Sequence, residues 1–340
     1  MTNGPPEPTL TRWYIDTRPL TSLTNTLPLL STLQPSDQTA VQKFYHLKDR
    51  HMSLVSNLLK YLFVHRTARV PWSEIVISRT PDPHRRPCYI HPAINKEGDG
   101  NVAVAEPINV EFNASHQASM VALVGTIIPP PSSSATEQAQ AEKAAKAKPE
   151  VGIDITCVNE RAGRKNEVRT LDSLHDYIDI FAEVFSAKEI AAMKSLHGSP
   201  SPASTSNQDV VDYGYRLFYT YWALKEAYIK MTGEALLAPW LRELEFGNVI
   251  APSKVDGDGV FGEPYKGVKT TLRGDIVDDV RVEVVALEDD YLFATAARGA
   301  GIGNGSGEQG EGQDPWGSFQ KLDIERDIKP CATGTCSCLS

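Results

Sequence analysis

The side chains of this chain that are best suited to chemistry are acids and lysines set at helical spacing. On a helix of 3.6 residues per turn, Trp222, Glu226 and Lys230 fall on one stripe. Lys225 lies about a quarter-turn away from Glu226, and a second acid, Asp154, stands upstream. Two carboxylates are enough protein ligands for Mg²⁺, and lysines stabilise phosphate charge. The simpler alternative is a solvated Glu226–Lys230 pair, worth about 0.2–0.5 kcal/mol.

These residues belong to a longer series of motifs. The segments of the series are, in chain order, residues 13–20, 44–51, 86–87, 112–117, 151–154 and 222–230. In content and order they resemble the 4′-phosphopantetheinyl transferases of the broad-specificity type that activates surfactin synthetase. The resemblance covers most of residues 10–298, and the length and Pro-rich inserts are most similar to a fungal member.

Length, charge and cysteine content restrict the class of protein. A chain of 340 residues exceeds the usual single-domain size of roughly 100–200, so two core-bearing units are expected. The net charge of −9 argues against a main role in binding nucleic acid. The five cysteines are unevenly spread, and the sequence shows neither a secretory leader nor a membrane-spanning run. We therefore expect a cytoplasmic protein without a membrane partner.

Hydrophobic periodicity and capping residues predict helices beside small sheets. The expected elements are a long helix capped by Ser36 and reaching residue 63, strands at 108–112, 120–124 and 151–158, a helix capped by Ser173, a helix opened by the capping box Ser186–Glu189, a helix ending near Gly233, and paired strands at 280–287 and 291–297. Residues 120–124 are apolar on both faces, which is typical of a central strand.

The resemblance implies an α+β fold built as a pseudo-dimer. Each of two similar subdomains would be a small, mostly antiparallel sheet packed by a long helix, with the coenzyme in the cleft between them. We expect an N-terminal subdomain at residues 1–126, an insert rich in Pro, Ser, Ala and Lys at 127–150, a C-terminal subdomain with the metal site at 151–298, and a Gly-rich linker and tail at 299–340.

The end of the chain is expected to be an unstructured tail. Glycines alternate with other residues in 299–307, but no strand-to-helix context supports a dinucleotide-binding loop there. Cys331, Cys336 and Cys338 follow without a histidine in the same segment, so they form an incomplete set of zinc ligands. The position of Cys338, third from the end, does not match a prenylation motif.

The resemblance also implies a reaction. Members of the family move the phosphopantetheine arm of coenzyme A to a serine hydroxyl of an acyl or peptidyl carrier protein and release adenosine 3′,5′-bisphosphate. By analogy Asp154, Glu226 and Lys230 would be catalytic, and Asp154 and Glu226 would bind Mg²⁺, with Mn²⁺ as a possible substitute. Many bacterial members carry a further acid at the position of Thr156, so water or the Thr156 hydroxyl would complete the metal shell. Glu226 is expected to be a metal ligand first and a candidate general base second.

Coenzyme A, the co-substrate, has its own implied contacts. The residues are Lys48, Arg50, Ser53, Arg86, Pro87, Ser115, His116, Gln117, Lys225 and Lys230. His116, aided by the Ser115 hydroxyl, would bind a phosphate, and Lys230 would lie near the pyrophosphate. Arg86 would contact adenine or the 3′-phosphate, and Arg85 offers an alternative alignment. Lys48, Arg50 and Ser53 would add 3′-phosphate contacts, although a solvated basic face explains Lys48 and Arg50 equally well.

The expected activity is that of a holo-acyl-carrier-protein synthase type transferase. Its expected partners are apo carrier domains of polyketide synthases, nonribosomal peptide synthetases, fatty acid synthase and the aminoadipate reductase of lysine biosynthesis, and the chain would act as a monomer. One alternative is a scaffold that binds coenzyme A and docks carriers without modifying them. Another is a different nucleotide phosphotransferase, but the P-loop and protein-kinase signatures are absent from the sequence.

Overall fold

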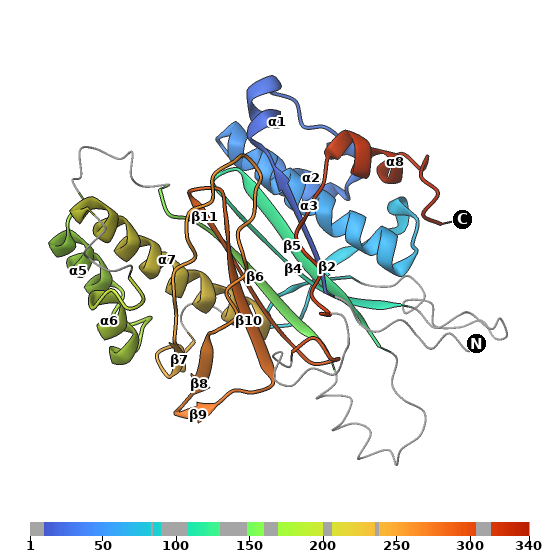
Figure 1. Cartoon of the computed structure of the whole chain (residues 1–340). Coiled ribbons are helices and arrows are strands. Elements are labelled where there is room, and N and C mark those ends of the chain that lie inside the picture. Colours follow the sequence, from blue (N-terminus) through green and yellow to red (C-terminus); the bar gives the residue numbers. More distant parts are fainter. Residues whose placement is uncertain are drawn as a thin grey trace, which may run out of the picture. The chain divides into compact units, whose positions relative to one another are not determined.

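The chain divides into two compact units. Unit 1 contains Met1–Val151 and Arg298–Ser340, and unit 2 contains Gly152–Ala297. The computed structural model describes residues 10–82, 84–89, 108–129, 148–159, 169–199, 206–234, 238–303 and 314–339. Most of the expected insert at 127–150 and part of the Gly-rich linker therefore lie outside the described residues. Figure 1 labels the elements of both units.

Unit 1 is built on a four-stranded sheet. Its elements are β1 (Thr11–Asp16), α1 (Arg18–Leu23), a 3₁₀ helix (Leu30–Thr32), α2 (Pro35–Gln42), α3 (Leu47–Ala68), a second 3₁₀ helix (Trp72–Glu74), β2 (Ile77–Arg79), β3 (Pro87–Tyr89), β4 (Asn109–Gln117), β5 (Met120–Ile128), β12 (Gln320–Lys321), a π-helix (Ile324–Ile328) and α8 (Lys329–Ala332). The strand order of the main sheet is β12-β1-β5-β4. Strand β5 runs antiparallel to β1 and β4, and β12 is parallel to β1.

The core of unit 1 lies between α3 and this sheet. The Phe63 ring of α3 contacts Trp13 of β1 and Phe112 of β4, with centroids 5.8 Å and 6.0 Å apart. The side chains of Met120 to Val124 on β5 are all fully buried. This confirms the prediction of a central strand, because only a strand covered on both faces excludes solvent from consecutive side chains.

The expected single helix over residues 36–63 is wrong. The structure has two helices, α2 and α3, separated by Lys43–His46, and Gln34 rather than Ser36 is the residue before α2. His46 adopts an extended conformation immediately before α3. Val41, Phe44 and Leu47 keep a spacing of three across the break, so the hydrophobic periodicity could not reveal it.

Unit 2 pairs a long helix with a second small sheet. Its elements are β6 (Glu150–Cys157), which begins at the end of unit 1, α5 (Leu171–Ile180), α6 (Ala187–Lys194), α7 (Asn207–Thr232), β7 (Leu244–Gly247), β8 (Lys269–Leu272), β9 (Asp275–Ile276), β10 (Val280–Leu287) and β11 (Tyr291–Arg298). The strand orders are β10-β11-β6 and β7-β8-β9. The predicted strands at 151–158, 280–287 and 291–297 are confirmed within one residue at each end.

Helix α7 contributes a large part of the core of unit 2. Leu217, Tyr221, Leu224 and Tyr228 recur at spacings of four and three, and all are buried in the core. The helix ends, as predicted, at Gly233, which takes the left-handed conformation with φ of 82°.

The capping predictions for the shorter helices had mixed outcomes. At α6 the reciprocal hydrogen bonds between Ser186 and Glu189 confirm the predicted capping box. At α5 the prediction of Ser173 as N-cap is wrong, because Thr170 caps the helix and Ser173 is its partner three residues on. Both are good capping residues, so the sequence could not choose between them.

The C-terminal segment is ordered, against the expectation of an unstructured tail. Residues 320–321 extend the main sheet beside β1, and a π-helix and α8 follow. Ile328 and Cys331 are buried against the core of unit 1. In Figure 1 α8, in red, lies beside the blue helix α3.

The predicted α+β class is confirmed. Each unit combines a small sheet with one long helix, α3 in unit 1 and α7 in unit 2. Among the described residues, no helix is both long enough and apolar enough to cross a membrane.

Candidate active site

Two of the predicted site residues meet in unit 2 although they lie far apart in the sequence. Lys230 Nζ, from the last turns of α7, donates to Asp154 Oδ1 on β6 at 2.6 Å. The Asp154 side chain is 8% exposed and that of Lys230 is 27% exposed. The pair therefore combines a nearly buried carboxylate with an ammonium group that a phosphate can still reach.

Gly152 explains why these two residues can meet. A β-carbon at this position would overlap the backbone of Ala227 and Met231 on α7. Strand β6 therefore runs against the helix backbone itself, and Asp154 follows two residues later on the same face of the strand. The Gly-x-Asp pattern therefore has a structural reason. The glycine lets the strand approach α7, and the approach places Asp154 within reach of Lys230.

Glu226 completes a group of three charged side chains. It lies one turn before Lys230 on α7 and is half-buried. Burial, and after it the charge of Asp154, raise the pKa of Glu226 to about 7, while Lys230 opposes the shift. The raised pKa shows that Asp154 and Glu226 repel each other when both are ionised. A divalent cation would relieve this repulsion, so the two carboxylates are a suitable pair of oxygen ligands.

Thr156 lies next to this carboxylate pair. Its hydroxyl donates to Asp154 Oδ2 at 2.8 Å, and both residues are buried. The two side chains share a face because they are two residues apart on one strand. With Lys230 on one oxygen and Thr156 on the other, the carboxylate of Asp154 is held in a fixed orientation.

Lys225 does not lie at this site. It is fully buried, and its Nζ forms an ion pair with Glu189 Oε2 at 3.0 Å. It also donates to the carbonyl oxygens of Leu241 and Leu244. Burial lowers the pKa of Lys225, and Glu189 opposes the shift. Neither expected role, an exposed helix lysine or a coenzyme contact, fits this placement, because the ammonium group is enclosed in unit 2.

Glu189 is a residue whose second role the sequence analysis missed. It closes the predicted capping box of α6, and its Oε1 also accepts from the backbone N–H of Phe246 at 2.9 Å. Burial raises its pKa, and Lys225 opposes the shift. The only signal in the sequence was the capping box, which does not indicate a buried partner.

The predicted phosphate contacts on β4 face two directions. Ser115 is buried, His116 is exposed and Gln117 is half-buried. Because side chains alternate along a strand, His116 shares the face of Phe112, which packs against α3, and Ser115 and Gln117 share the other face. The expected cooperation of Ser115 with His116 on one phosphate therefore does not fit the strand geometry.

The first turns of α3 lie at the same end of unit 1 as His116. The backbone N–H of Ser119, in the turn after β4, donates to Met52 Sδ at 3.2 Å. Near Met52 the helix carries Lys48, which is exposed, and Arg50 and Ser53, which are half-buried. Arg50 Nε donates to Phe44 O at 2.7 Å.

Arg86 and Pro87 lie at the other end of β4. Arg86 forms an ion pair with Glu111, and its guanidinium also lies 3.4 Å from Val151 O. Burial lowers the pKa of Arg86. Glu111 is five residues from His116, or about 17 Å along a strand. The alternative, Arg85, is largely exposed and makes a loose 3.8 Å contact with Asp82.

Trp222, predicted on the stripe of Glu226, packs among aromatic rings. Its ring centroid lies 5.3 Å from that of Phe181 and 6.5 Å from that of Phe218. Phe218 is on α7 itself and Phe181 is the residue that follows α5, so Trp222 anchors the helix that carries the acid to the end of α5.

Comparison with known proteins gives consistent matches along the chain. The family model "4′-phosphopantetheinyl transferase, N-terminal" matches residues 21–128, and "4′-phosphopantetheinyl transferase superfamily" matches residues 150–272. The 4′-phosphopantetheinyl transferase NpgA of Emericella nidulans is 65% identical over 347 aligned residues, covering 98% of this chain and 97% of the relative. The 4′-phosphopantetheinyl transferase A of Aspergillus fumigatus is 56% identical, covering 97% and 96%. The L-aminoadipate-semialdehyde dehydrogenase-phosphopantetheinyl transferase of Mus musculus is 23% identical, covering 79% and 68%.

Proposed function

The chain belongs to the 4′-phosphopantetheinyl transferases, and we propose that Asp154, Glu226 and Lys230 carry its transfer reaction. The enzyme moves the phosphopantetheine arm of coenzyme A to a serine of an apo carrier protein domain and releases adenosine 3′,5′-bisphosphate. The observation that carries the proposed site is the 2.6 Å contact of Lys230 with Asp154, beside a second acid whose pKa is about 7.

The proposed metal ligands are Asp154 and Glu226. Mg²⁺, or Mn²⁺ in its place, prefers oxygen ligands and keeps several waters, so two carboxylates and the phosphates of the coenzyme are sufficient. When bound, such an ion would neutralise charge on the pyrophosphate. Thr156 would keep Asp154 oriented through its 2.8 Å hydrogen bond, with water completing the ligand shell.

Lys230 and Glu226 have further proposed roles. The ammonium group of Lys230 would stabilise the negative charge that develops on the leaving phosphate. The serine hydroxyl must lose a proton as it attacks, and a carboxylate near that hydroxyl can accept it directly or through water. Metal ligation is the first proposed role of Glu226, and proton acceptance is its second.

Besides Lys230, the proposed coenzyme contacts come from two regions of unit 1. His116 and the first turns of α3 would bind one phosphate group, and Arg86 with Pro87 would contact the adenine or the 3′-phosphate. Ser115 and Gln117, on the opposite face of β4, would not share a phosphate with His116. Lys225 is omitted from the contacts because its charge is satisfied by Glu189.

The proposed partners are carrier domains of several systems. They are the carriers of polyketide synthases, nonribosomal peptide synthetases, fatty acid synthase and aminoadipate reductase, the last supported by the name of the mouse relative. We further propose broad carrier specificity of the surfactin-synthetase-activating type, a holo-acyl-carrier-protein synthase reaction, a monomer and a cytoplasmic location.

The transfer assay mixes the full chain, coenzyme A, Mg²⁺ and apo carrier domains of several classes, and weighs each carrier by mass spectrometry. A carrier that gains the phosphopantetheine mass supports the proposal. Asp154→Asn and Glu226→Gln should each lower the rate at least about 100-fold, as expected for a group that stabilises transition-state charge. Glu183→Gln is the matched control, since this side chain is 89% exposed on unit 2.

Two results would contradict the proposal. One is a folded chain that leaves every carrier class unmodified. The other is a Glu226→Gln variant with normal turnover. A protein that only docked carriers would bind them equally well with or without Glu226.

A further inference from the structure

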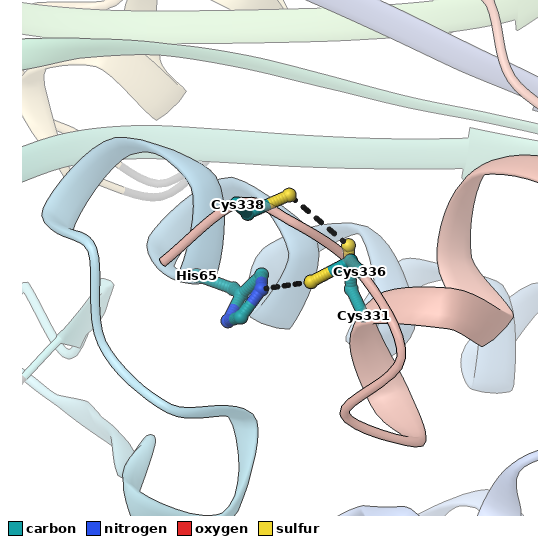
Figure 2. Close-up of side chains that lie close together, drawn as sticks. All are labelled: His65, Cys331, Cys336 and Cys338. Carbon is teal, nitrogen blue, oxygen red and sulfur yellow. Dashed lines mark hydrogen bonds between the residues drawn. The ribbon is translucent and has the colours of Figure 1, made fainter. Parts of the chain in front are cut away.

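Four side chains that carry metal-binding atoms converge in unit 1, whereas Asp154, Glu226 and Lys230 belong to unit 2. His65 comes from α3, and Cys331, Cys336 and Cys338 come from the C-terminal segment. Figure 2 shows their imidazole and thiol groups turned toward one another. One ligand atom from each side chain lies within 4.8 Å of the other three. We propose that these four side chains form a structural Zn²⁺ site.

The distances between the ligand atoms suit a tetrahedral ion. With Zn–S bonds of about 2.3 Å and tetrahedral angles, two sulfurs should lie about 3.8 Å apart, and sulfur and nitrogen about 3.6 Å apart. Cys331 Sγ and Cys338 Sγ are 3.7 Å apart, and His65 Nε2 is 3.2 Å from Cys336 Sγ. A disulfide would need sulfurs about 2.05 Å apart. The cluster therefore needs only small adjustments to hold an ion.

The orientation of the His65 ring also favours a metal ligand. Nδ1 lies 2.7 Å from the carbonyl oxygen of Val70, and because a carbonyl can only accept, Nδ1 carries the proton. In the neutral ring this leaves the lone pair of Nε2 directed at the thiols. A second nitrogen that donates to a backbone carbonyl is the usual arrangement of a histidine bound to zinc. The ring is 2% exposed, so its orientation is fixed.

The charge around the cluster is compatible with three thiolates. Zn²⁺ binding would displace the three thiol protons, which leaves a site with a net charge of −1. Two arginines, one on α3 and one directly after it, reach the C-terminal segment that carries the cysteines. Arg66 donates to Asp327 O at 2.8 Å, and Arg69 donates to Cys338 O. Their positive charges would offset that of the site.

The ligand set indicates zinc rather than another ion. One imidazole and three thiolates in a tetrahedral arrangement, with no open position, are a common structural zinc set. Two of the four ligands are buried and two are half-buried, and four protein ligands would leave no coordination position for a substrate. The proposed ion would fasten the C-terminal segment to α3, and the inference does not depend on the transfer reaction.

The test measures zinc in the full chain after removal of any histidine tag. The protein is reduced, supplied with Zn²⁺ alone, freed of excess ion, and analysed by mass spectrometry of the metal. We expect about one zinc per chain. Cys336→Ser and Cys338→Ser should lose it. Cys88→Ser is the matched control, because this cysteine of β3 lies outside the cluster, and it should retain the ion.

Two further measurements separate loss of the ligand from loss of the fold. Co²⁺ in place of zinc should give the visible absorption and the sulfur-to-metal charge transfer of a tetrahedral thiolate site in the wild-type chain only. A zinc-selective chelator should lower the melting temperature of the wild-type chain and leave that of a folded Cys336→Ser variant unchanged.

Three results would overturn the proposal. They are a reduced wild-type chain that holds no zinc, serine variants that hold as much zinc as the wild type, and a Cys331–Cys338 disulfide in freshly purified protein.

Discussion

Lys225 and Glu226 are neighbours in the sequence, but their side chains serve different structures. Successive positions on a helix point about 100° apart, so one can face the core while the next faces a site. Lys225 is enclosed with Glu189, and Glu226 lies with Asp154 and Lys230. At the scale of single residues, one stretch of α7 therefore supplies both a buried ion pair and the proposed catalytic acid.

Replacing Lys225 by Met should destabilise the fold rather than weaken coenzyme binding. Removing one partner of a buried pair leaves the other charge uncompensated, which costs about 3–5 kcal/mol. Lys188→Met removes a largely exposed lysine that pairs with Glu245, and should cost less than about 1 kcal/mol. Urea unfolding of both variants measures the difference. A Lys225→Met chain of normal stability that had lost affinity for coenzyme A would restore the phosphate role.

Glu226→Gln should change how stability depends on pH in metal-free buffer. The pKa of Glu226 rises on folding from 4.5 to about 7, so between these values the folded chain binds more protons than the unfolded chain. The free energy of unfolding contributed by this group therefore falls as pH rises through this window and stays lower above it. The amide carries no charge, so the variant should be more stable than the wild type at pH about 8 and similar to it near pH about 4. Urea unfolding with a chelator present, at both pH values, tests this, and equal stability at the higher pH would contradict it.

At the scale of elements, the contact between β6 and α7 positions the site. Gly152 allows the strand to lie against the helix backbone. This close approach brings Asp154 of β6 within hydrogen-bond distance of Lys230 of α7. The sequence predicted both elements but not their contact, because the space around a glycine depends on the partner that packs there.

Gly152→Ala should damage both stability and activity. The added methyl group would overlap the backbone of α7, which cannot move aside as a side chain can, and overpacking of this kind costs about 1–3 kcal/mol. Gly247→Ala is the matched control on β7, where the new methyl group would lie 3.8 Å from Lys269. The melting temperature and the transfer rate should both fall for Gly152→Ala and change little for Gly247→Ala. A Gly152→Ala chain with normal turnover would show that the close contact is not needed.

At the scale of the whole molecule, the sequence predicted local features better than distant partners. The central strand β5 and the end of α7 at Gly233 follow from local patterns, and the structure has them where expected. The partners Glu189 for Lys225 and His65 for Cys336 lie 36 and 271 positions away along the chain, where no local periodicity can point to them. The expectation of an unstructured tail failed for the same reason, because the segment pairs with β1 and packs against α3, both of which are far away in the sequence.

The proposed transfer reaction depends most on a divalent cation held by Asp154 and Glu226 together. The direct measurement is a titration of the full chain with Mn²⁺ in the presence of coenzyme A, followed by electron paramagnetic resonance of the free ion. The wild type should bind one Mn²⁺, competed by Mg²⁺, and Asp154→Asn and Glu226→Gln should each weaken binding at least about 10-fold, while Glu183→Gln binds normally. Binding in either site variant as tight as in the wild type would contradict the account.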